Sequence, residues 1–288
     1  MARAWRVTLG VTLGRLNGKV ALVSGAARGQ GRTHAIRLAQ EGADIVAFDR
    51  CEDFSTVDYG MATEADLNET VLAVEALDRR ILAEKMDVRD SVGVRRLVES
   101  ASAAFGRLDI VVANAGILQI APFTEVSDEL WDDVIGTNLT GVFKTVRAAL
   151  PVILEGGRGG AVVLIASTAG VKGHANTAPY SAAKHGVVAL TRVLANEYGQ
   201  HWIRTNAVLP TTVGTDMVHT QAIYALMSGG DPNATQAQAV AGFSTLNSLP
   251  VPWIEPIDVS NAVVWLASDE SRYVNGALIA VDAGCTAK

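Results

Sequence analysis

The stretch VALVSGAARGQG, residues 20–31, decides how this chain folds. Its first half is a run of apolar residues without polar alternation, which is typical of a parallel strand covered on both faces. Its second half contains three glycines and leads into a helical pattern that continues through Leu38. A strand, a glycine-rich turn and a helix in direct succession form the opening unit of a doubly wound α/β sheet.

The glycine-rich turn also predicts a phosphate site. Gly25, Gly29 and Gly31 permit a tight turn that lets backbone amides approach a pyrophosphate, and the N-terminus of the following helix adds a favourable dipole. Arg28 and Gln30 lie within the same loop. Three glycines alone could form an ordinary turn, but their position between a strand and a helix favours dinucleotide binding.

The alternation of strand and helix repeats about six times along the chain. Besides residues 19–24, apolar runs predict strands at residues 44–48, 81–86, 109–113, 161–166, 205–208 and 277–281. Thr63 is predicted to cap a helix, with Asp66 at the answering position. We therefore expect an α/β fold of the Rossmann type, a doubly wound parallel sheet of about seven strands with helices on both faces.

The chain shows no proline-rich or low-complexity linker, so we expect one domain over residues 19–288 after an N-terminal extension, residues 1–18. Two segments interrupt the strand–helix rhythm. Residues 51–62 form an insertion that is long for a connection of this kind. Residues 211–255 are long enough to form a partly helical lid.

The composition excludes several classes of protein. A net charge of −6 without a basic patch argues against nucleic-acid binding. No apolar run approaches the roughly 20 residues of a membrane helix, and the five histidines lack metal-ligand spacing. Cys51 and Cys285 lie far apart and no signal peptide precedes them, so we expect reduced thiols in a cytoplasmic protein.

Two carboxylates follow predicted strands. Asp49 lies 18 residues beyond Gly31, where it can accept both adenosine ribose hydroxyls. It would repel the extra phosphate of NADP by about 4 kcal/mol at ~4 Å and an effective dielectric of about 20, although Arg28 and Arg50 would offset part of this. NAD is therefore the expected cofactor. Asp87 either reaches the adenine amino group or caps a helix, and the sequence favours neither.

The residues that suggest chemistry lie further along the chain. They are Asn114-Ala115-Gly116 after the fourth strand, Asn138 in a helical stretch, Ser167 after the fifth strand, and Tyr180 with Lys184. The spacing of four places the last two side chains on one face of a helix. Taken singly, each has an ordinary explanation: a turn cap for Ser167, a solvated amine for Lys184.

Together, in this order and spacing, these motifs resemble the short-chain dehydrogenase/reductase superfamily, over essentially residues 19–284. The resemblance implies that Tyr180 is the acid/base and that Lys184 binds the nicotinamide ribose while lowering the pKa of the tyrosine. It implies that Ser167 holds the reacting oxygen and that Asn138 orders a water for proton relay. Lowering a tyrosine pKa from about 10 to about 7 requires roughly 4 kcal/mol, within reach of a nearby ammonium and a cationic cofactor ring.

Two departures narrow the resemblance. The usual Pro-Gly after the sixth strand is replaced by NAVLPTTVGT, residues 206–215, and the insertion is followed by DVRD, residues 87–90. This combination is similar to the mycofactocin-associated, carveol dehydrogenase-like subfamily. That implies a tightly held NAD covered by residues 51–62, electron transfer to mycofactocin, and a homotetramer packed through the helices around Asn138 and Tyr180. The implied cofactor contacts are Gly25, Arg28, Gly29, Gln30, Gly31, Asp49, Arg50, Asp87, Val88, Asn114, Ala115, Gly116, Tyr180, Lys184, Pro210, Val213 and Thr215.

The lid segment is rich in apolar residues and favours a hydrophobic secondary alcohol, such as a cyclic terpenoid, over a sugar or an acyl-carrier thioester. These residues are Met217, Ile223, Tyr224, Leu226, Met227, Phe243, Leu246 and Trp253. Two alternatives stay open at this point: an NADPH-dependent 3-oxoacyl-thioester reductase, and a non-enzymatic NAD(H)-sensing protein. Asp49 argues against the first, and the presence of both Tyr180 and Lys184 argues against the second.

Overall fold

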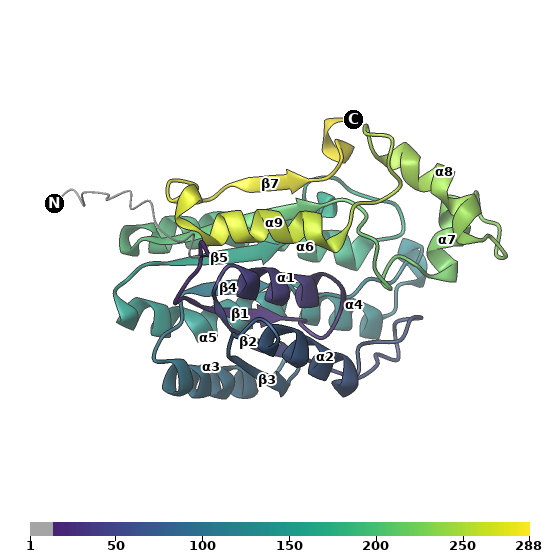
Figure 1. The fold of residues 1–288 in the computed structure, drawn as a ribbon. Coiled ribbons are helices and arrows are strands. Elements are labelled where there is room, and N and C mark those ends of the chain that lie inside the picture. Colours follow the sequence, from purple (N-terminus) through teal and green to yellow (C-terminus); the bar gives the residue numbers. More distant parts are fainter. Residues whose placement is uncertain (1–13) are drawn as a thin grey trace.

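The fold is built on one parallel sheet. The computed structural model describes residues 14–288, and within them seven strands hydrogen-bond in the order β3-β2-β1-β4-β5-β6-β7, as Figure 1 shows. Every neighbouring pair is parallel. The strands are β1 (Val20–Ser24), β2 (Asp44–Asp49), β3 (Ile81–Lys85), β4 (Ile110–Ala113), β5 (Gly160–Ile165), β6 (Ile203–Pro210) and β7 (Leu278–Val281). The predicted doubly wound sheet is confirmed, with its order reversing between β1 and β4.

Helices cover both faces of the sheet. The α-helices of the described residues are α1 (Gly29–Gln40), α2 (Glu64–Glu75), α3 (Ser91–Phe105), α4 (Asp128–Ile135), α5 (Gly141–Gly156), α6 (Ala178–Tyr198), α7 (Gln221–Met227), α8 (Gln236–Leu246) and α9 (Pro256–Ala267). Helix α2 begins with the predicted capping box: the Thr63 hydroxyl accepts from the Asp66 amide, and the Asp66 carboxylate accepts from the Thr63 amide.

Alternate residues of each strand feed two apolar cores. Ala21 and Val23 of β1 pack with α1, α2 and α9 on one face of the sheet. Val20 and Leu22 face the opposite side and pack with α3, α5 and α6. Since both faces are covered, the strands are apolar at nearly every position, which explains why their sequences lack a polar alternation.

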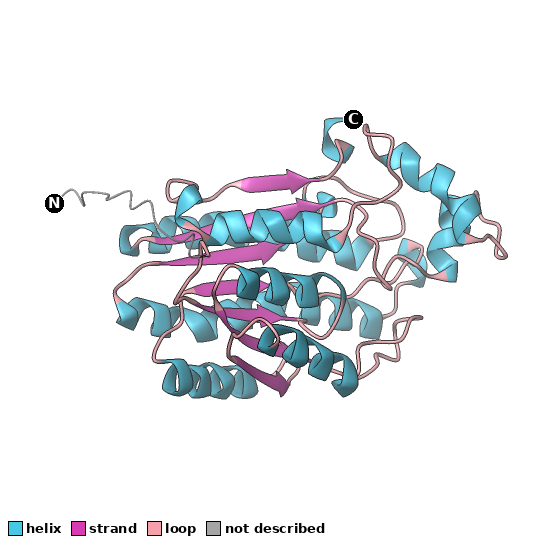
Figure 2. Cartoon of the chain, viewed as in Figure 1, coloured by secondary structure: helices cyan, strands magenta, loops and turns pink. Residues whose placement is uncertain are grey.

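The carboxyl ends of the strands share one edge of the sheet. In Figure 2 the strand arrows point toward the same side of the molecule, and α7 and α8 lie beyond that edge. Residues 211–255 contain these two helices, and residues 51–62 connect β2 to α2 without helix or strand. Both segments that interrupt the alternation of strands and helices therefore lie at the edge where ligands bind in open α/β sheets.

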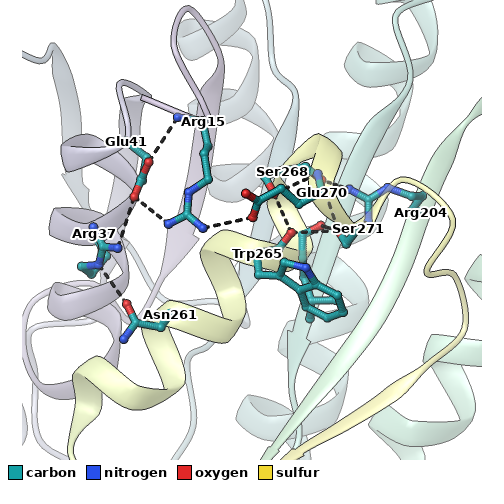
Figure 3. Close-up of polar contacts among 10 residues, drawn as sticks. Arg15, Arg37, Glu41, Arg204, Asn261, Trp265, Ser268, Glu270 and Ser271 are labelled. Carbon is teal, nitrogen blue, oxygen red and sulfur yellow. Dashed lines mark hydrogen bonds and ion pairs between the residues drawn. The ribbon is translucent and has the colours of Figure 1, made fainter. Parts of the chain in front are cut away.

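Residues 14–18 were assigned to an N-terminal extension, but they pack against the domain. Leu16 is fully buried, and its amide donates to the Glu41 carbonyl. Figure 3 shows Arg15 reaching both Glu41 and Glu270, with N···O distances of 2.6 and 3.2 Å. The apolar leucine and these ion pairs attach the segment to α1 and to the turn after α9. The remainder of the predicted extension, residues 1–13, lies outside the described residues.

Candidate active site

A cavity of about 520 Å³ opens at the carboxyl edge of the sheet. Its walls come from the glycine-rich loop, the ends of the strands, the insertion, the lid segment and the C-terminal turn. Every predicted site residue except Asn138 lines it: Gly25, Arg28, Gly29, Gln30, Gly31, Asp49, Arg50, Asp87, Val88, Asn114, Ala115, Gly116, Ser167, Tyr180, Lys184, Pro210, Val213 and Thr215. Residues far apart in the sequence thus converge on one site.

The glycine-rich loop is packed tightly against the end of β4. The Ser24 hydroxyl accepts from the amides of Asn114 and Ala115, at 3.0 and 3.1 Å. A side chain at Gly31 would put its Cβ 1.8 Å from the Gly25 carbonyl oxygen, so this turn excludes any larger residue. The Ser24 hydroxyl therefore bridges the glycine-rich loop and the end of β4.

The adenosine end of the predicted site contains Asp49, Arg50 and Asp87. Asp49 accepts from the Ala27 amide at 3.0 Å, and burial raises the pKa of its carboxyl. Arg50 stacks over the Phe54 ring, 3.8 Å from its centroid, and lies 3.5 Å from an Asp87 oxygen. Asp87 also pairs with the Arg89 guanidinium. The helix-capping alternative for Asp87 is wrong, because the N-cap of α3 is Asp90.

The predicted catalytic side chains meet at the other end of the cavity. Tyr180 and Lys184 lie one turn apart on α6, with the Lys184 Nζ 5.5 Å from the centroid of the tyrosine ring. Nζ donates to the Ile165 carbonyl at the end of β5, with an N···O distance of 2.8 Å. Ser167 acts on the Tyr180 hydroxyl and lowers the pKa of its phenol. Three elements, β5, the turn after it and α6, therefore hold these three groups together.

Burial acts on both titratable groups. It raises the pKa of the Tyr180 phenol, which the hydrogen bond from Ser167 lowers again in part. It lowers the pKa of the Lys184 amine to about 8. Among the residues present, desolvation of the phenolate outweighs the effect of Ser167 on the pKa of Tyr180. The lowering of this pKa by Lys184 together with a bound nicotinamide ring stays a prediction. The tyrosine is a neutral phenol at pH 7 until more positive charge arrives.

Asn138 does not line the cavity. It is fully buried in a π-helical segment, Gly136–Thr140, between α4 and α5. Its Oδ1 accepts from the Ile117 amide and its Nδ2 donates to the Ile117 carbonyl, both at 2.8 Å. The amide side chain is thereby engaged in holding the chain after β4. These contacts give it a positioning role, and the predicted ordering of a water molecule by Asn138 stays a prediction.

The residues present fit a dinucleotide. Gly29 adopts a left-handed φ of +53° where the loop passes the cavity. Three cavity-lining residues carry buried polar atoms without a hydrogen-bond partner in the described chain: Gln30 Oε1, Arg50 Nε and Nη1, and Thr137 Oγ1. Buried polar groups are normally satisfied, so such atoms around one cavity indicate a polar ligand.

Several cavity residues were missed by the sequence reasoning. Tyr59 and Met61 come from the insertion, His174 from the turn before α6, and Cys285 from the C-terminal turn. Cys51 and Cys285 are both buried free thiols. Tyr59 offered a signal, since it is an aromatic residue in a polar, glycine-containing loop. The others sit on segments that only the tertiary fold brings to the site.

The lid residues divide into two groups. Met217, Ile223, Leu226, Met227, Phe243 and Leu246 line the cavity. Tyr224 and Trp253 pack behind them around Phe243, with the Trp253 ring edge-on to that of Phe243 at 5.6 Å. The substrate part of the cavity is therefore apolar and is supported by a small core of its own.

Within residues 14–288 no three His, Cys, Asp or Glu side chains gather as metal ligands. Over the same residues no helix has the length and apolar character needed to cross a membrane.

Comparison with known proteins gives the class. Residues 19–223 match the family described as short chain dehydrogenase. This stretch includes the glycine-rich loop and all four predicted catalytic residues. The chain belongs to the short-chain dehydrogenase family.

Particular relatives are similar over nearly the whole chain. A (−)-trans-carveol dehydrogenase of Rhodococcus erythropolis is 46% identical, with 96% of this chain and 100% of that protein covered. A short-chain type dehydrogenase/reductase of Mycolicibacterium smegmatis is 49% identical, over 96% and 99%. The crystal structure of carveol dehydrogenase from Mycobacterium avium, a complex with NAD, superposes with a TM-score of 0.94 at 49% identity, covering 96% of this chain and 100% of that one.

Proposed function

We propose that this protein is an NAD-dependent dehydrogenase that interconverts a hydrophobic secondary alcohol and its ketone. The observation that carries the proposal is the Tyr180–Ser167 hydroxyl pair with the Lys184 ammonium beside it, in a cavity that also contains the glycine-rich loop. The family and its carveol dehydrogenase relatives support the same reaction class.

The protein's own residues handle the proton. Ser167 holds the substrate oxygen beside the Tyr180 hydroxyl, and Tyr180 Oη takes the alcohol proton in oxidation or returns it in reduction. Lys184 stabilises the phenolate through its charge, with Nζ fixed by the Ile165 carbonyl. NAD⁺, when bound, accepts the hydride from the carbinol carbon and brings a cationic ring near the phenol.

The geometry at the adenosine end supports NAD over NADP. The Asp49 carboxylate lies in the cavity wall, at the position expected for the ribose hydroxyls. At that position its charge would repel the 2′-phosphate of NADP. This arrangement weighs against the NADPH-dependent thioester reductase.

Contacts between the covering segments support a tightly held cofactor. The Arg28 guanidinium donates to the Gly60 carbonyl of the insertion and pairs with Asp216 of the lid segment, at 2.6 and 3.1 Å. Arg28 of the glycine-rich loop therefore links the insertion to the lid segment. Slow exchange of NAD would in turn require another electron acceptor, for which the subfamily resemblance suggests mycofactocin.

The assembly is proposed to be a homotetramer. Phe143 on α5 and Val193 on α6 are 44% and 48% exposed, on the helices that the resemblance assigns to the interface. Sedimentation of the purified protein would decide the oligomeric state.

The test of the function has two arms. Mass analysis of the ligand released on denaturation is expected to recover NAD(H) at a near-equal molar amount, and an empty or NADP-loaded protein would contradict the proposal. Turnover of a cyclic terpenoid alcohol is then compared between the parent and Tyr180→Phe. The variant is expected to lose at least a hundredfold in kcat while keeping the bound nucleotide.

A further inference from the structure

Three consecutive residues of the insertion contact different parts of the site. The Asp58 amide donates to Gln119 Oε1 at 3.1 Å. The Tyr59 hydroxyl accepts from the Leu118 amide at 3.2 Å. The Gly60 carbonyl accepts from Arg28 at 2.6 Å. The insertion is therefore bound to the chain after β4 as well as to the glycine-rich loop.

The chain after β4 forms a wall of the substrate part of the cavity. Residues 117–120, called here the wall segment, have neither helix nor strand. Leu118 and Ile120 line the cavity and pack against the lid core around Phe243. Because no regular element holds this segment, its position depends on a few contacts: Asn138 with Ile117, and Tyr59 with Leu118.

The Tyr59 side chain is partly buried at the cavity. It lines the cavity, and the charge of an ionised Tyr180 would raise the pKa of the Tyr59 phenol. Burial raises the pKa of its phenol to about 12, so the hydroxyl stays protonated at neutral pH. The hydroxyl accepts from Leu118, and none of residues 14–288 accepts its proton. Its remaining proton is free for a group inside the cavity.

We propose that Tyr59 is a substrate-positioning residue: its hydroxyl fixes the wall segment through the Leu118 amide and so selects ring-shaped alcohols. This inference rests on the proposed function and extends it to the insertion, which then serves the substrate as well as the cofactor. Removal of the hydroxyl leaves the partly buried Leu118 N–H without a partner and releases the wall. A substrate that fills the cavity needs that wall, whereas a small one does not.

The test compares Tyr59→Phe with the parent on a cyclic terpenoid alcohol and on 2-butanol. For the cyclic alcohol kcat/KM is expected to fall about tenfold, equivalent to ~1.4 kcal/mol, mainly through a higher KM. For 2-butanol it is expected to change less than twofold, and bound NAD is expected to stay the same. An equal fall with both alcohols, or no fall with either, would overturn the proposal.

A matched control separates a local effect from a general one. Tyr273→Phe makes the same chemical change at a ring that is 79% exposed and outside the cavity. It is expected to leave kcat/KM unchanged for both the cyclic alcohol and 2-butanol. If Tyr59→Phe does not fold, Gln119→Leu removes the neighbouring contact to Asp58. It is expected to shift selectivity in the same direction, and unchanged selectivity would count against the proposal.

Two readouts do not depend on turnover. The Leu118 amide is expected to exchange hydrogen faster in Tyr59→Phe than in the parent, and equal exchange would refute the role of Tyr59. Calorimetry should show a cyclic terpenoid ketone binding about tenfold more weakly to the variant. If the parent oxidises neither alcohol, the proposed function fails, and these two measurements still decide the role of Tyr59: equal ketone affinity, or no ketone binding to the parent, would overturn it.

Discussion

Lys184 is buried and Tyr180 is partly buried, and desolvation disfavours the charged form of each. A phenol with a raised pKa stays protonated at neutral pH, so the form that can donate a proton predominates in the absence of further charge. The reduction of a ketone, which requires the protonated phenol, is therefore the direction that the protein's own residues favour. Oxidation depends on whatever additional positive charge is bound beside the ring.

The rates of alcohol oxidation and of ketone reduction should depend on pH in opposite directions. Alcohol oxidation needs ionised Tyr180, so kcat/KM is expected to rise with pH, by up to tenfold per unit below the pKa of the tyrosine. Ketone reduction needs the phenol and is expected to fall above that pKa. Steady-state rates between pH 6 and 10 would check both. Parallel profiles in the two directions would remove Tyr180 from the role of acid/base.

Asp49 gives a second prediction at this scale. Asp49→Asn removes the negative charge at the adenosine end while keeping an oxygen to accept from Ala27. The preference for NAD over NADP in kcat/KM is expected to fall by at least tenfold, because repulsion of the 2′-phosphate is relieved. Phe105→Leu, on the outer helix α3, serves as a control. An unchanged preference would show that Asp49 does not face the ribose.

Much of the candidate site could be predicted at the residue scale, since its members follow strands whose carboxyl ends must share an edge. The glycines, Asp49 and Ser167 obey that rule. Tyr180 and Lys184 lie on α6 and were identified by their spacing of four and by the family resemblance. The orientation of Asn138 could not be predicted, because only the fold reveals that its amide faces Ile117 rather than the cavity. Tyr59 and Cys285 were missed because long-range packing brings them in.

At the scale of elements, the π-helical segment between α4 and α5 is held in register with the chain after β4. Asn138→Ala would leave the buried Ile117 N–H and C=O without partners. The free energy of unfolding is expected to fall by about 2–4 kcal/mol, from the loss of two hydrogen bonds and the desolvation of both groups. Chemical denaturation would measure it.

Asn261→Ala provides the comparison for that variant. Asn261 is exposed on α9 and accepts a hydrogen bond from Arg37. Its removal is expected to cost under about 0.5 kcal/mol, as for most surface substitutions. Equal losses in the two variants would contradict the positioning role of Asn138.

Most strands were predictable to within one residue at each end because continuous apolar runs mark buried parallel strands. The exception is β6, predicted at residues 205–208, which extends two residues further at each end and spans Ile203–Pro210. Its polar residues break the apolar run, yet they are satisfied inside the fold: Arg204 donates to the Ser268 carbonyl and Asn206 to the Val274 carbonyl. These partners come from the turn after α9, more than 60 residues later, and no local sequence pattern predicts the contacts.

At the scale of the whole molecule, the contact between α1 and α9 contains a fully buried histidine. The His34 Nδ1 lies 2.6 Å from the Ser260 hydroxyl, which itself donates to the Pro256 carbonyl. Nδ1 is therefore the donor, and Nε2 carries the lone pair without a partner among the described residues. Burial lowers the pKa of this imidazole from 6.5 to about 3.

This imidazole makes stability depend on pH. Above pH ~6.5 it is neutral in both the folded and the unfolded state. Below that value the unfolded chain binds a proton that the folded one excludes, so the free energy of unfolding falls by up to about 1.4 kcal/mol per pH unit down to about pH 3. Denaturant unfolding between pH 7.5 and 5 should show that the free energy of unfolding falls as the pH falls. His34→Leu is expected to reduce the slope of this dependence on pH.

His201→Gln is the corresponding control, because His201 is exposed. The slope of its unfolding free energy against pH is expected to match that of the parent. If His34→Leu kept the parent slope as well, other groups would account for the acid sensitivity of the molecule.

The last turn of the chain is part of the cavity wall. Cys285 lines it, and the Lys288 amine donates to the Thr245 carbonyl on α8, beside the lid core. A purification tag or fusion partner joined after Lys288 would thus be tethered beside the cavity wall, next to α8. Immobilisation through an engineered thiol on the outer surface of α3 would keep the tether away from that wall.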